Sequence, residues 1–198
     1  MSEPSTGIRV RPASGDRFDD LATMLAPKRP DAFACWCLSY RIDPTTNRRL
    51  GPDERRSYAR ELTARPIPAG VLAYRSGTVV GWAAVAPRAQ VHSFAHSTRI
   101  PMVDDAPVWS IWCVKTRPGH RRQGITRELI IGAVEFARSH GAPAVEAYPV
   151  DNAGQRIDTT LAFVGTRSMF EAAGFTKVAD TGSTAARLPR ILMRRDLS

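Results

Sequence analysis

Apolar and polar positions recur along this chain with two different periods, and each change of period predicts the boundary of an element. Residues 7–12 alternate apolar and basic side chains as a half-buried strand does, and apolar residues then recur at helical spacing over residues 18–25. A second helix is expected over residues 52–65, because a proline suits the first turn of a helix. Residues 30–44 are rich in aromatic residues and cysteine and show no clear period.

The rest of the chain shows β-type runs separated by two further helical stretches. The strands are expected at residues 70–75, 79–86, 107–116, 144–150, 175–179 and 188–194. The first two are joined by Ser76-Gly77 and predict a hairpin. Apolar residues over 125–137 cover so much of a helix that it should pack against a sheet, and a last helix is expected over residues 166–173. Polar loops are expected over residues 90–106 and 151–161.

Length and composition indicate a single globular domain. The 198 residues, 43% of them hydrophobic, are enough to bury one core, and no linker or repeat divides them. We expect a cytoplasmic protein, because no apolar run is long enough to span a membrane and the N-terminus does not resemble a secretion signal. Three cysteines are then expected to be thiols. The net charge of +9 favours anionic partners, but the basic residues are mostly arginines spread along the whole chain, which is weak support for nucleic acid.

One turn between a predicted strand and a predicted helix has the chemistry of an anion site. The first amides of a helix lack intrahelical acceptors and the helix dipole adds positive potential, so an anion is stabilised there without a dedicated side chain. Gly124 allows close approach of the backbone, and Arg121 and Arg122 add charge-assisted hydrogen bonds to phosphate. The turn lacks the lysine of a P-loop and the spacing G-x-G-x-x-G, which disfavours nucleotide hydrolysis and dinucleotide binding.

The motif Arg121-x-x-Gly124-x-Thr126 resembles the acetyl-CoA signature of the GNAT superfamily of N-acetyltransferases. Pro118 precedes the motif by three residues, as in the family's P-x-x-R. The hairpin that contains Val80-Gly-Trp82 is similar to the family's second and third strands, and residues 169–175 are similar to its closing leucine-tyrosine-x-x-x-glycine-phenylalanine. Four elements in the same order over about residues 7–195 make the resemblance specific.

The resemblance implies an α/β (α+β) fold, in which a mixed, mostly antiparallel central sheet of six to seven strands has splayed central strands and is flanked by helices. It implies one N-acetyltransferase domain over residues 1–198, with the acceptor side in about residues 30–65 and the cofactor core in about residues 107–175. The implied acyl donor is acetyl-CoA, with no metal, and a backbone amide at the end of the strand before the turn would bond the thioester oxygen. The implied cofactor-binding residues are Val114, Lys115, Thr116, Arg121, Arg122, Gln123, Gly124, Ile125, Thr126 and Phe170.

The sequence departs from the family pattern where many members carry their general acid. Phe170 stands in place of the tyrosine that would protonate the leaving thiolate, and Phe163 in place of the asparagine seven residues earlier, for which Asn152 is a candidate substitute. Glu146 and Tyr148 lie two apart on the strand after the cofactor helix, so we expect Glu146 to act as a base through water and Tyr148 as the replacement acid. The competing interpretation makes Glu146 a solvated strand residue and Tyr148 a core residue.

Other interpretations stay open at this point. Cys35 and Cys37 with His92 or His96 form a conceivable zinc site, although one C-x-C pair is below the usual ligand pattern. Cys113 is a conceivable acyl carrier, although direct transfer to the amine is favoured. A rival function is a non-catalytic acyl-CoA-binding or nucleic-acid-binding module on the same fold. The acceptor is a small-molecule or peptide amine that the sequence does not identify, no membrane partner is expected, and a homodimer is possible.

Overall fold

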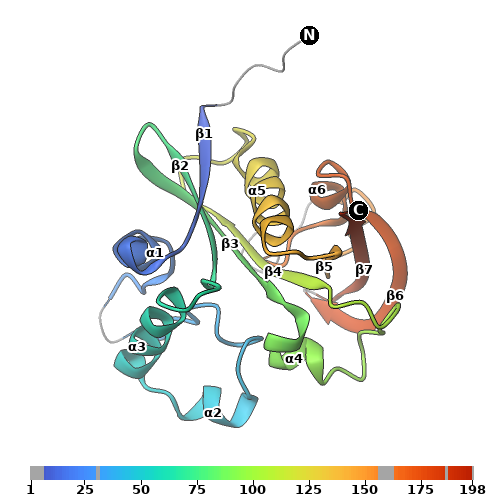
Figure 1. Cartoon of the computed structure of the whole chain (residues 1–198), viewed down its shortest axis with the longest axis horizontal. Helices are drawn as coiled ribbons and strands as arrows, with labels where there is room; N and C mark the ends of the chain where they lie inside the picture. Colours follow the sequence, from blue (N-terminus) through green and yellow to red (C-terminus); the bar gives the residue numbers. More distant parts are fainter. Residues whose placement is uncertain (1–6, 30–31, 156–162, 186, 198) are drawn as a thin grey trace.

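The computed structural model describes residues 7–29, 32–155, 163–185 and 187–197, and a seven-stranded sheet forms its centre (Figure 1). The strands are β1 Ile8–Pro12, β2 Gly70–Arg75, β3 Thr78–Pro87, β4 Trp109–Thr116, β5 Ala144–Ala147, β6 Thr176–Ala185 and β7 Leu188–Asp196. They are ordered β1-β2-β3-β4-β5-β7-β6, and all neighbours are antiparallel except β4 and β5. The expected mixed, mostly antiparallel sheet is therefore confirmed.

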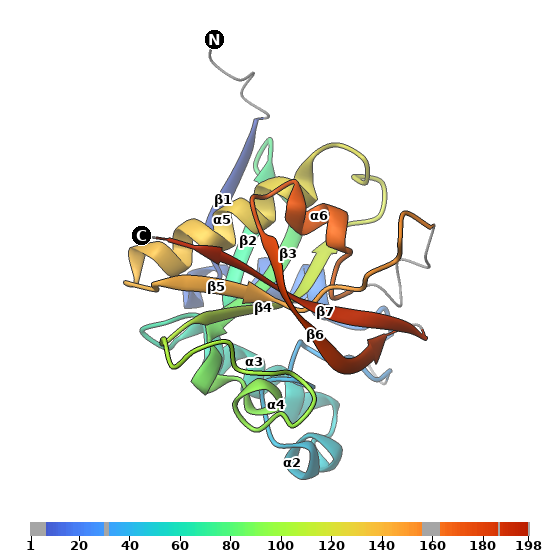
Figure 2. The ribbon, with the colours of Figure 1, turned by 90° about the vertical axis from the view of Figure 1, so that its right-hand side faces the viewer.

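Helices cover both faces of this sheet. They are α1 Phe18–Leu25, α2 Pro44–Arg49, α3 Pro52–Thr63, α4 His92–Ala95, α5 Ile125–Ser139 and α6 Arg167–Glu171, with 3-10 turns at Gly15–Arg17 and Arg88–Gln90. Figure 2 shows α5 and α6 on one face and α2, α3 and α4 on the other. None of the helices in the described part of the chain is long and apolar enough to cross a membrane.

The two faces of the sheet bury two separate apolar clusters. Successive residues of β3 point to opposite faces, so Trp82 joins the cluster beneath α1 and α3, whereas Ala83 joins the cluster beneath α5. On the second face α5 lies so close to β1 that a Cβ added at Gly132 would be 2.4 Å from Cγ1 of Val10. The broad apolar surface expected for this helix therefore packs against the sheet.

Several boundaries differ from the sequence-based expectation. The polar loop expected over residues 90–106 contains α4. α2 lies between the unpatterned residues 30–44 and the helix expected from residue 52, where the sequence pattern predicts no element, and Asp43 caps it by accepting hydrogen bonds from two backbone amides at 2.9 Å. β5 is shorter than expected, and Val150 makes only isolated bridges to Thr166 and Arg190. β6 is longer than expected because β7 pairs with it over almost its full length. Part of the loop expected over residues 151–161 lies outside the described residues.

Candidate functional site

The turn between β4 and α5 is exposed, and several of its residues have a left-handed backbone conformation. Gly119, Arg122 and Gly124 have φ angles of 87°, 60° and 79°, and residues 121–124 are exposed. No atom lies within 4 Å of a Cβ built at Gly124, so the backbone conformation, rather than lack of space, favours glycine there. Gly124 is also the N-cap of α5, whose leading amides have no intrahelical acceptor. This is the geometry of an anion site.

The side chains around the turn keep positive charge available. Within the described part of the chain, Arg121 and Arg122 have no salt-bridge partner, and both are exposed. Gln123 Oε1 accepts a hydrogen bond from Arg75. The hydroxyl oxygens of Thr116 and Thr126 lie 3.1 Å apart and join the end of β4 to the first turn of α5. Predicted cofactor residues from the strand end and from the turn are thus brought together.

Ile125 supplies the anchor of this turn. Its side chain is buried in the cluster beneath α5, only 1% exposed. The residue after Gly124 therefore belongs to the core, while the residues before it face solvent. A rigid helix start below an exposed loop is what a preorganised anion site needs.

Next to the turn, the central strands separate. The parallel pairing of β4 and β5 ends at Ile111 and Ala147, and a register shift between β3 and β4 leaves Trp112 as a bulge. Beyond that point the Val114 amide donates to the carbonyl of Phe163, with N and O 2.8 Å apart. The amide predicted to bond a thioester oxygen belongs to residues 114–116, and one of these candidates, the Val114 amide, thus has an internal acceptor. A role of Val114 in the cofactor site stays a prediction and requires Phe163 to release its amide.

Two other predicted cofactor residues lie apart from the exposed turn. Lys115 Nζ donates to the carbonyl of Met24 at 3.3 Å, which directs this side chain toward α1. Phe170 is fully buried, with its ring centroid 5.2 Å from that of Phe175. A contact between Phe170 and a cofactor stays a prediction that would require this part of the core to open.

The two residues predicted to be catalytic lie together in a buried polar cluster. The Tyr148 hydroxyl donates to Oε2 of Glu146 at 2.9 Å and lies 2.9 Å from the Ser110 hydroxyl. The same Glu146 oxygen accepts a hydrogen bond from Nη1 of Arg88 at 2.8 Å. All four residues are buried, and Glu146 is 1% exposed. Glu146 therefore faces an arginine and a phenol rather than bulk water.

Burial limits the acid chemistry that Tyr148 can perform. Burial, and then the charge of Glu146, raise the pKa of the Tyr148 hydroxyl well above its ordinary value of about 10. An ordinary thiol has a pKa of about 8.5, so proton transfer from this phenol to a thiolate is uphill. The contacts favour a positioning role for Tyr148 and Glu146, and their direct roles as acid and base stay predictions.

Sequence reasoning missed the buried arginines that complete this cluster. Besides its bond to Glu146, Arg88 donates to the carbonyl of Pro101 at 3.4 Å. Arg190 is 2% exposed and donates through Nε to the carbonyl of Tyr148 at 2.7 Å. Arginine is usually exposed and carries no periodic signal when it is buried, so the sequence pattern does not mark these two.

The cysteines and the loop asparagine have ordinary partners. Cys35 Sγ lies 3.0 Å from the Ser39 hydroxyl, and Cys37 Sγ accepts a hydrogen bond from Nε1 of Trp82 at 3.0 Å. Asn152 donates to the carbonyl of its near neighbour in the loop, Gln155. In the described ranges, no group of three or more histidine, cysteine or acidic residues is placed to hold a metal ion, so the zinc interpretation gains no support there.

Comparisons with known proteins agree with this architecture. In solved structures, the chain is similar to an aminoglycoside acetyltransferase in complex with coenzyme A, with a TM-score of 0.55 and 13% identity over 96% of this chain and 94% of that chain. An N-acetyltransferase from Staphylococcus aureus gives a TM-score of 0.55 and 12% identity over 96% and 99% of the two chains. A ribosomal-protein-alanine N-acetyltransferase from Brucella melitensis gives a TM-score of 0.53 and 17% identity over 96% of this chain and 99% of that chain. At these identities the likeness shows a shared fold.

The sequence comparison extends this result to the family. A comparison with curated protein sequences gave no match. The profile described as the acetyltransferase (GNAT) family matches residues 36–157, which is more than half of the chain and includes β2 to β5 and the turn before α5. The chain therefore belongs to the GNAT family of acetyltransferases.

Proposed function

We propose that this protein is an N-acetyltransferase that moves the acetyl group of acetyl-CoA to a primary amine by direct attack. The observation that carries the proposal is the exposed turn at residues 121–124, which leads into the N-terminus of α5 within a chain of the GNAT family. The similar aminoglycoside acetyltransferase was solved with coenzyme A, which supports the choice of donor.

The residues present fit the anionic part of this donor. A pyrophosphate would accept hydrogen bonds from the leading amides of α5, where the helix dipole favours negative charge. The guanidinium groups of Arg121 and Arg122 would add charge-assisted hydrogen bonds, and the Thr116 and Thr126 hydroxyls lie at the foot of the same turn. The pantetheine arm would then run toward Val114, where β4 and β5 diverge.

The reaction needs a neutral amine beside a polarised thioester. The nitrogen lone pair attacks the thioester carbonyl carbon, the C–N bond forms as the C–S bond breaks, coenzyme A leaves as the thiolate, and the surplus ammonium proton passes to the thiolate or to water. A lysine-like amine has a pKa of about 10.4, so a group or a water chain must take its proton near neutral pH. Glu146, through water, and Tyr148 are the candidates that the sequence offers for the base and the acid. The buried ion pair of Glu146 with Arg88 and the raised pKa of the Tyr148 hydroxyl favour a positioning role for both instead.

Thiol release from acetyl-CoA, followed against a panel of primary amines, tests this function. We expect amine-dependent release that falls at least about tenfold in kcat/KM when Arg121→Gln and Arg122→Gln are combined. Arg138→Gln is the matched control, because Arg138 lies at the far end of the same helix and pairs with Glu135 at 2.6 Å. Turnover that is absent for every amine would contradict the proposal.

A non-catalytic role is the second candidate. It is supported by the bond between Val114 and Phe163, which occupies one of the candidate amides at the end of β4, and by the buried Phe170 in place of a proton donor. Binding of acetyl-CoA without turnover would favour this role. Nucleic-acid binding that weakens steeply with salt would favour the nucleic-acid version, since phosphate contacts release counterions. A cytoplasmic location and a homodimer are further parts of the main proposal, and light scattering after gel filtration tests the dimer.

A further inference from the structure

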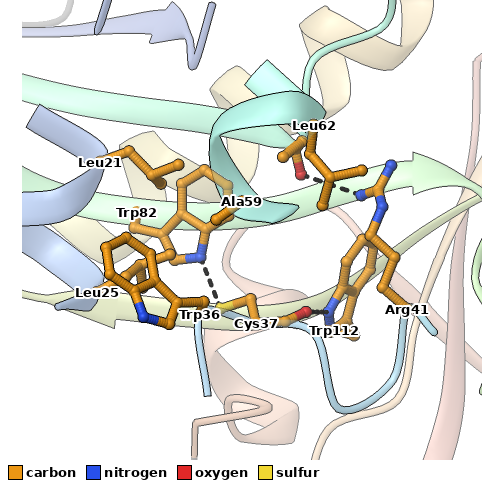
Figure 3. A pocket seen from close by; sticks show the side chains of 10 residues that line it. Leu21, Leu25, Trp36, Cys37, Arg41, Ala59, Leu62, Trp82 and Trp112 are labelled. Carbon is orange, nitrogen blue, oxygen red and sulfur yellow. Dashed lines mark hydrogen bonds between the residues drawn. The ribbon is translucent and has the colours of Figure 1, made fainter. Parts of the chain in front are cut away.

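Two cysteines from distant parts of the chain meet on the face of the sheet opposite α5. Cys113 of β4 belongs to the apolar cluster on this face, and Cys37 packs against that cluster. The Cys37 thiol accepts from Nε1 of Trp82 at 3.0 Å, and its carbonyl accepts from Nε1 of Trp112 at 3.4 Å (Figure 3). Cys113 pairs with Ala84, two residues after Trp82, so its side chain lies on the same face as that indole. The two thiols are hydrogen-bonded to each other.

The turn that carries Cys37 has an unfavourable backbone conformation. Trp36 and Cys37 have φ angles of 50° and 57°, a left-handed conformation that residues with a Cβ rarely adopt. Trp36 is buried, and its ring stacks on that of Phe18 in α1, with the centroids 6.1 Å apart. The packing of this indole therefore fixes the turn and holds the Cys37 thiol against the sheet. Backbone strain of this kind is concentrated at functional sites.

Positive charge surrounds the Cys37 thiol. The hydrogen bond with Cys113 has the largest effect and lowers the pKa of the Cys37 thiol, whereas burial raises it. The Trp82 indole and the charges of Lys115 and Arg41 lower this pKa further. The pKa of the Cys113 thiol is raised, first by its hydrogen bond to Cys37 and then by burial. Within this pair, Cys37 is therefore the sulfur that ionises first.

A thiolate at Cys37 also accounts for an unpaired cation nearby. Arg41 is buried, and among the described residues its Nη2 has no hydrogen-bond partner and no carboxylate pairs with it. A buried charge is costly unless it is paired. Arg41 and the Cys37 thiol line the same small cavity and interact electrostatically, so a thiolate supplies the negative charge that this guanidinium lacks.

We propose that Cys37 and Cys113 form a reversible disulfide when the protein meets a peroxide. The Cys37 thiolate attacks one peroxide oxygen, and the S–O bond forms as the O–O bond breaks. The other oxygen leaves as hydroxide, which takes the proton that Cys37 gave up and becomes water. The Cys113 sulfur then attacks the sulfenic acid at Cys37, and the S–S bond forms as the S–O bond breaks. Hydroxide leaves with the Cys113 proton as a second water, so two thiols are oxidised and one hydrogen peroxide is reduced.

The surroundings of the two thiols select a small oxidant. The cavity that Cys37 lines has a volume of about 10 Å³, close to the space that one water molecule needs, so a bulky disulfide reagent has no room beside it. Hydrogen peroxide is the smallest oxidant of the peroxide class. Cys37 is half-buried and Cys113 is buried, so the oxidant meets Cys37 first and Cys113 resolves the sulfenic acid.

The disulfide would join the segment proposed to form the acceptor side to β4, at the residue before Val114. We expect this bond to slow acetyl transfer, because it fixes the strand along which the donor is proposed to lie. The effect on transfer rests on the proposed function, whereas formation of the disulfide depends only on the two thiols and their surroundings.

Thiol counting and peptide mapping test the disulfide directly. Folded, reduced protein is treated with hydrogen peroxide, unfolded, alkylated and digested. We expect the free thiols to fall from three to one, with a peptide pair linked through Cys37 and Cys113, and dithiothreitol should restore all three. Cys37→Ser and Cys113→Ser should each prevent the link. Cys35→Ser is the matched control and should form it, because the Cys35 thiol lies 3.0 Å from the Ser39 hydroxyl in the same turn.

The unmodified protein alone can overturn the proposal, so the test does not depend on a variant that folds. Three free thiols after a treatment that oxidises the exposed Met102 would do so, as would a link through Cys35. A Cys37 sulfinic acid without any link would also do so. After removal of the peroxide, acetyl transfer should be at least about tenfold slower in the linked protein and recover on reduction; unchanged turnover in fully linked protein would contradict that effect. Failure of the proposed function appears separately, as absence of turnover in reduced protein that still forms the disulfide.

Discussion

Replacing Glu146 by glutamine separates a buried ion-pair partner from a catalytic base. The carboxylate accepts from Arg88 at 2.8 Å and from Tyr148 at 2.9 Å, and the side chains of Arg88 and Glu146 are 10% and 2% exposed. Glutamine keeps the shape but removes the charge, which leaves the Arg88 guanidinium buried with only carbonyl partners, such as that of Pro101. Breaking a buried pair from one side costs about 3–5 kcal/mol. We therefore expect Glu146→Gln to lower the free energy of unfolding by about that amount.

The size of this effect is large enough for routine assays. A protein of this length loses about 2–4 °C in Tm per kcal/mol, so Glu146→Gln should melt about 6–20 °C lower. Arg88→Met combined with Glu146→Gln should recover part of the loss, because no unpaired charge is then buried. Urea unfolding followed by circular dichroism gives the free energies, and thiol release below both melting points gives the turnover. A stability within about 0.5 kcal/mol of the parent, with turnover more than a hundredfold lower, would refute the ion-pair account and favour Glu146 as the base.

Three further predictions concern the pH dependence of stability and two glycines. Above pH 10 the unfolded chain loses the Tyr148 proton that the folded chain keeps, so the free energy of unfolding should fall by up to about 1.4 kcal/mol per pH unit. In Tyr148→Phe the fall between pH 9 and 11 should be smaller, and an identical fall in both proteins would contradict this prediction. Gly132→Ala should lower stability by about 1–3 kcal/mol in urea unfolding, because its Cβ would meet Val10 at 2.4 Å; a gain in stability would show that β1 and α5 separate easily. A Cβ at Gly124 would meet no atom, but the backbone there has a φ of 79°. Gly124→Ala should therefore lower the free energy of unfolding by about 1–2 kcal/mol in the same assay and weaken coenzyme A binding. Unchanged stability together with unchanged binding would count against the anion turn.

Local signals explain the parts of the fold that the sequence predicted. The hairpin of β2 and β3 turns through Ser76 and Gly77, which both have positive φ angles of 49° and 77°. The same reasoning holds for Gly124, whose left-handed backbone begins α5. In each case the residue type and the required conformation are neighbours in sequence, so a short window contains the information.

The rest depends on contacts between segments far apart in the chain. Arg88, which follows β3, pairs with Glu146 of β5, and the guanidinium of Arg41, which lies in a turn before α2, is placed over the Trp112 ring of β4. The bond from Val114 to Phe163 likewise joins β4 to a later loop. Arginine and phenylalanine at these positions give no periodic signal, and only the assembled sheet shows which of them are buried together.

The affinity of acetyl-CoA, measured by isothermal titration calorimetry, tests most directly that the turn before α5 holds the donor. One site per chain is expected, with a Kd that rises at least about tenfold when Arg121→Gln and Arg122→Gln are combined and that does not change in Arg138→Gln. Absence of binding to the unmodified protein, or equal affinity in all three proteins, would contradict the account.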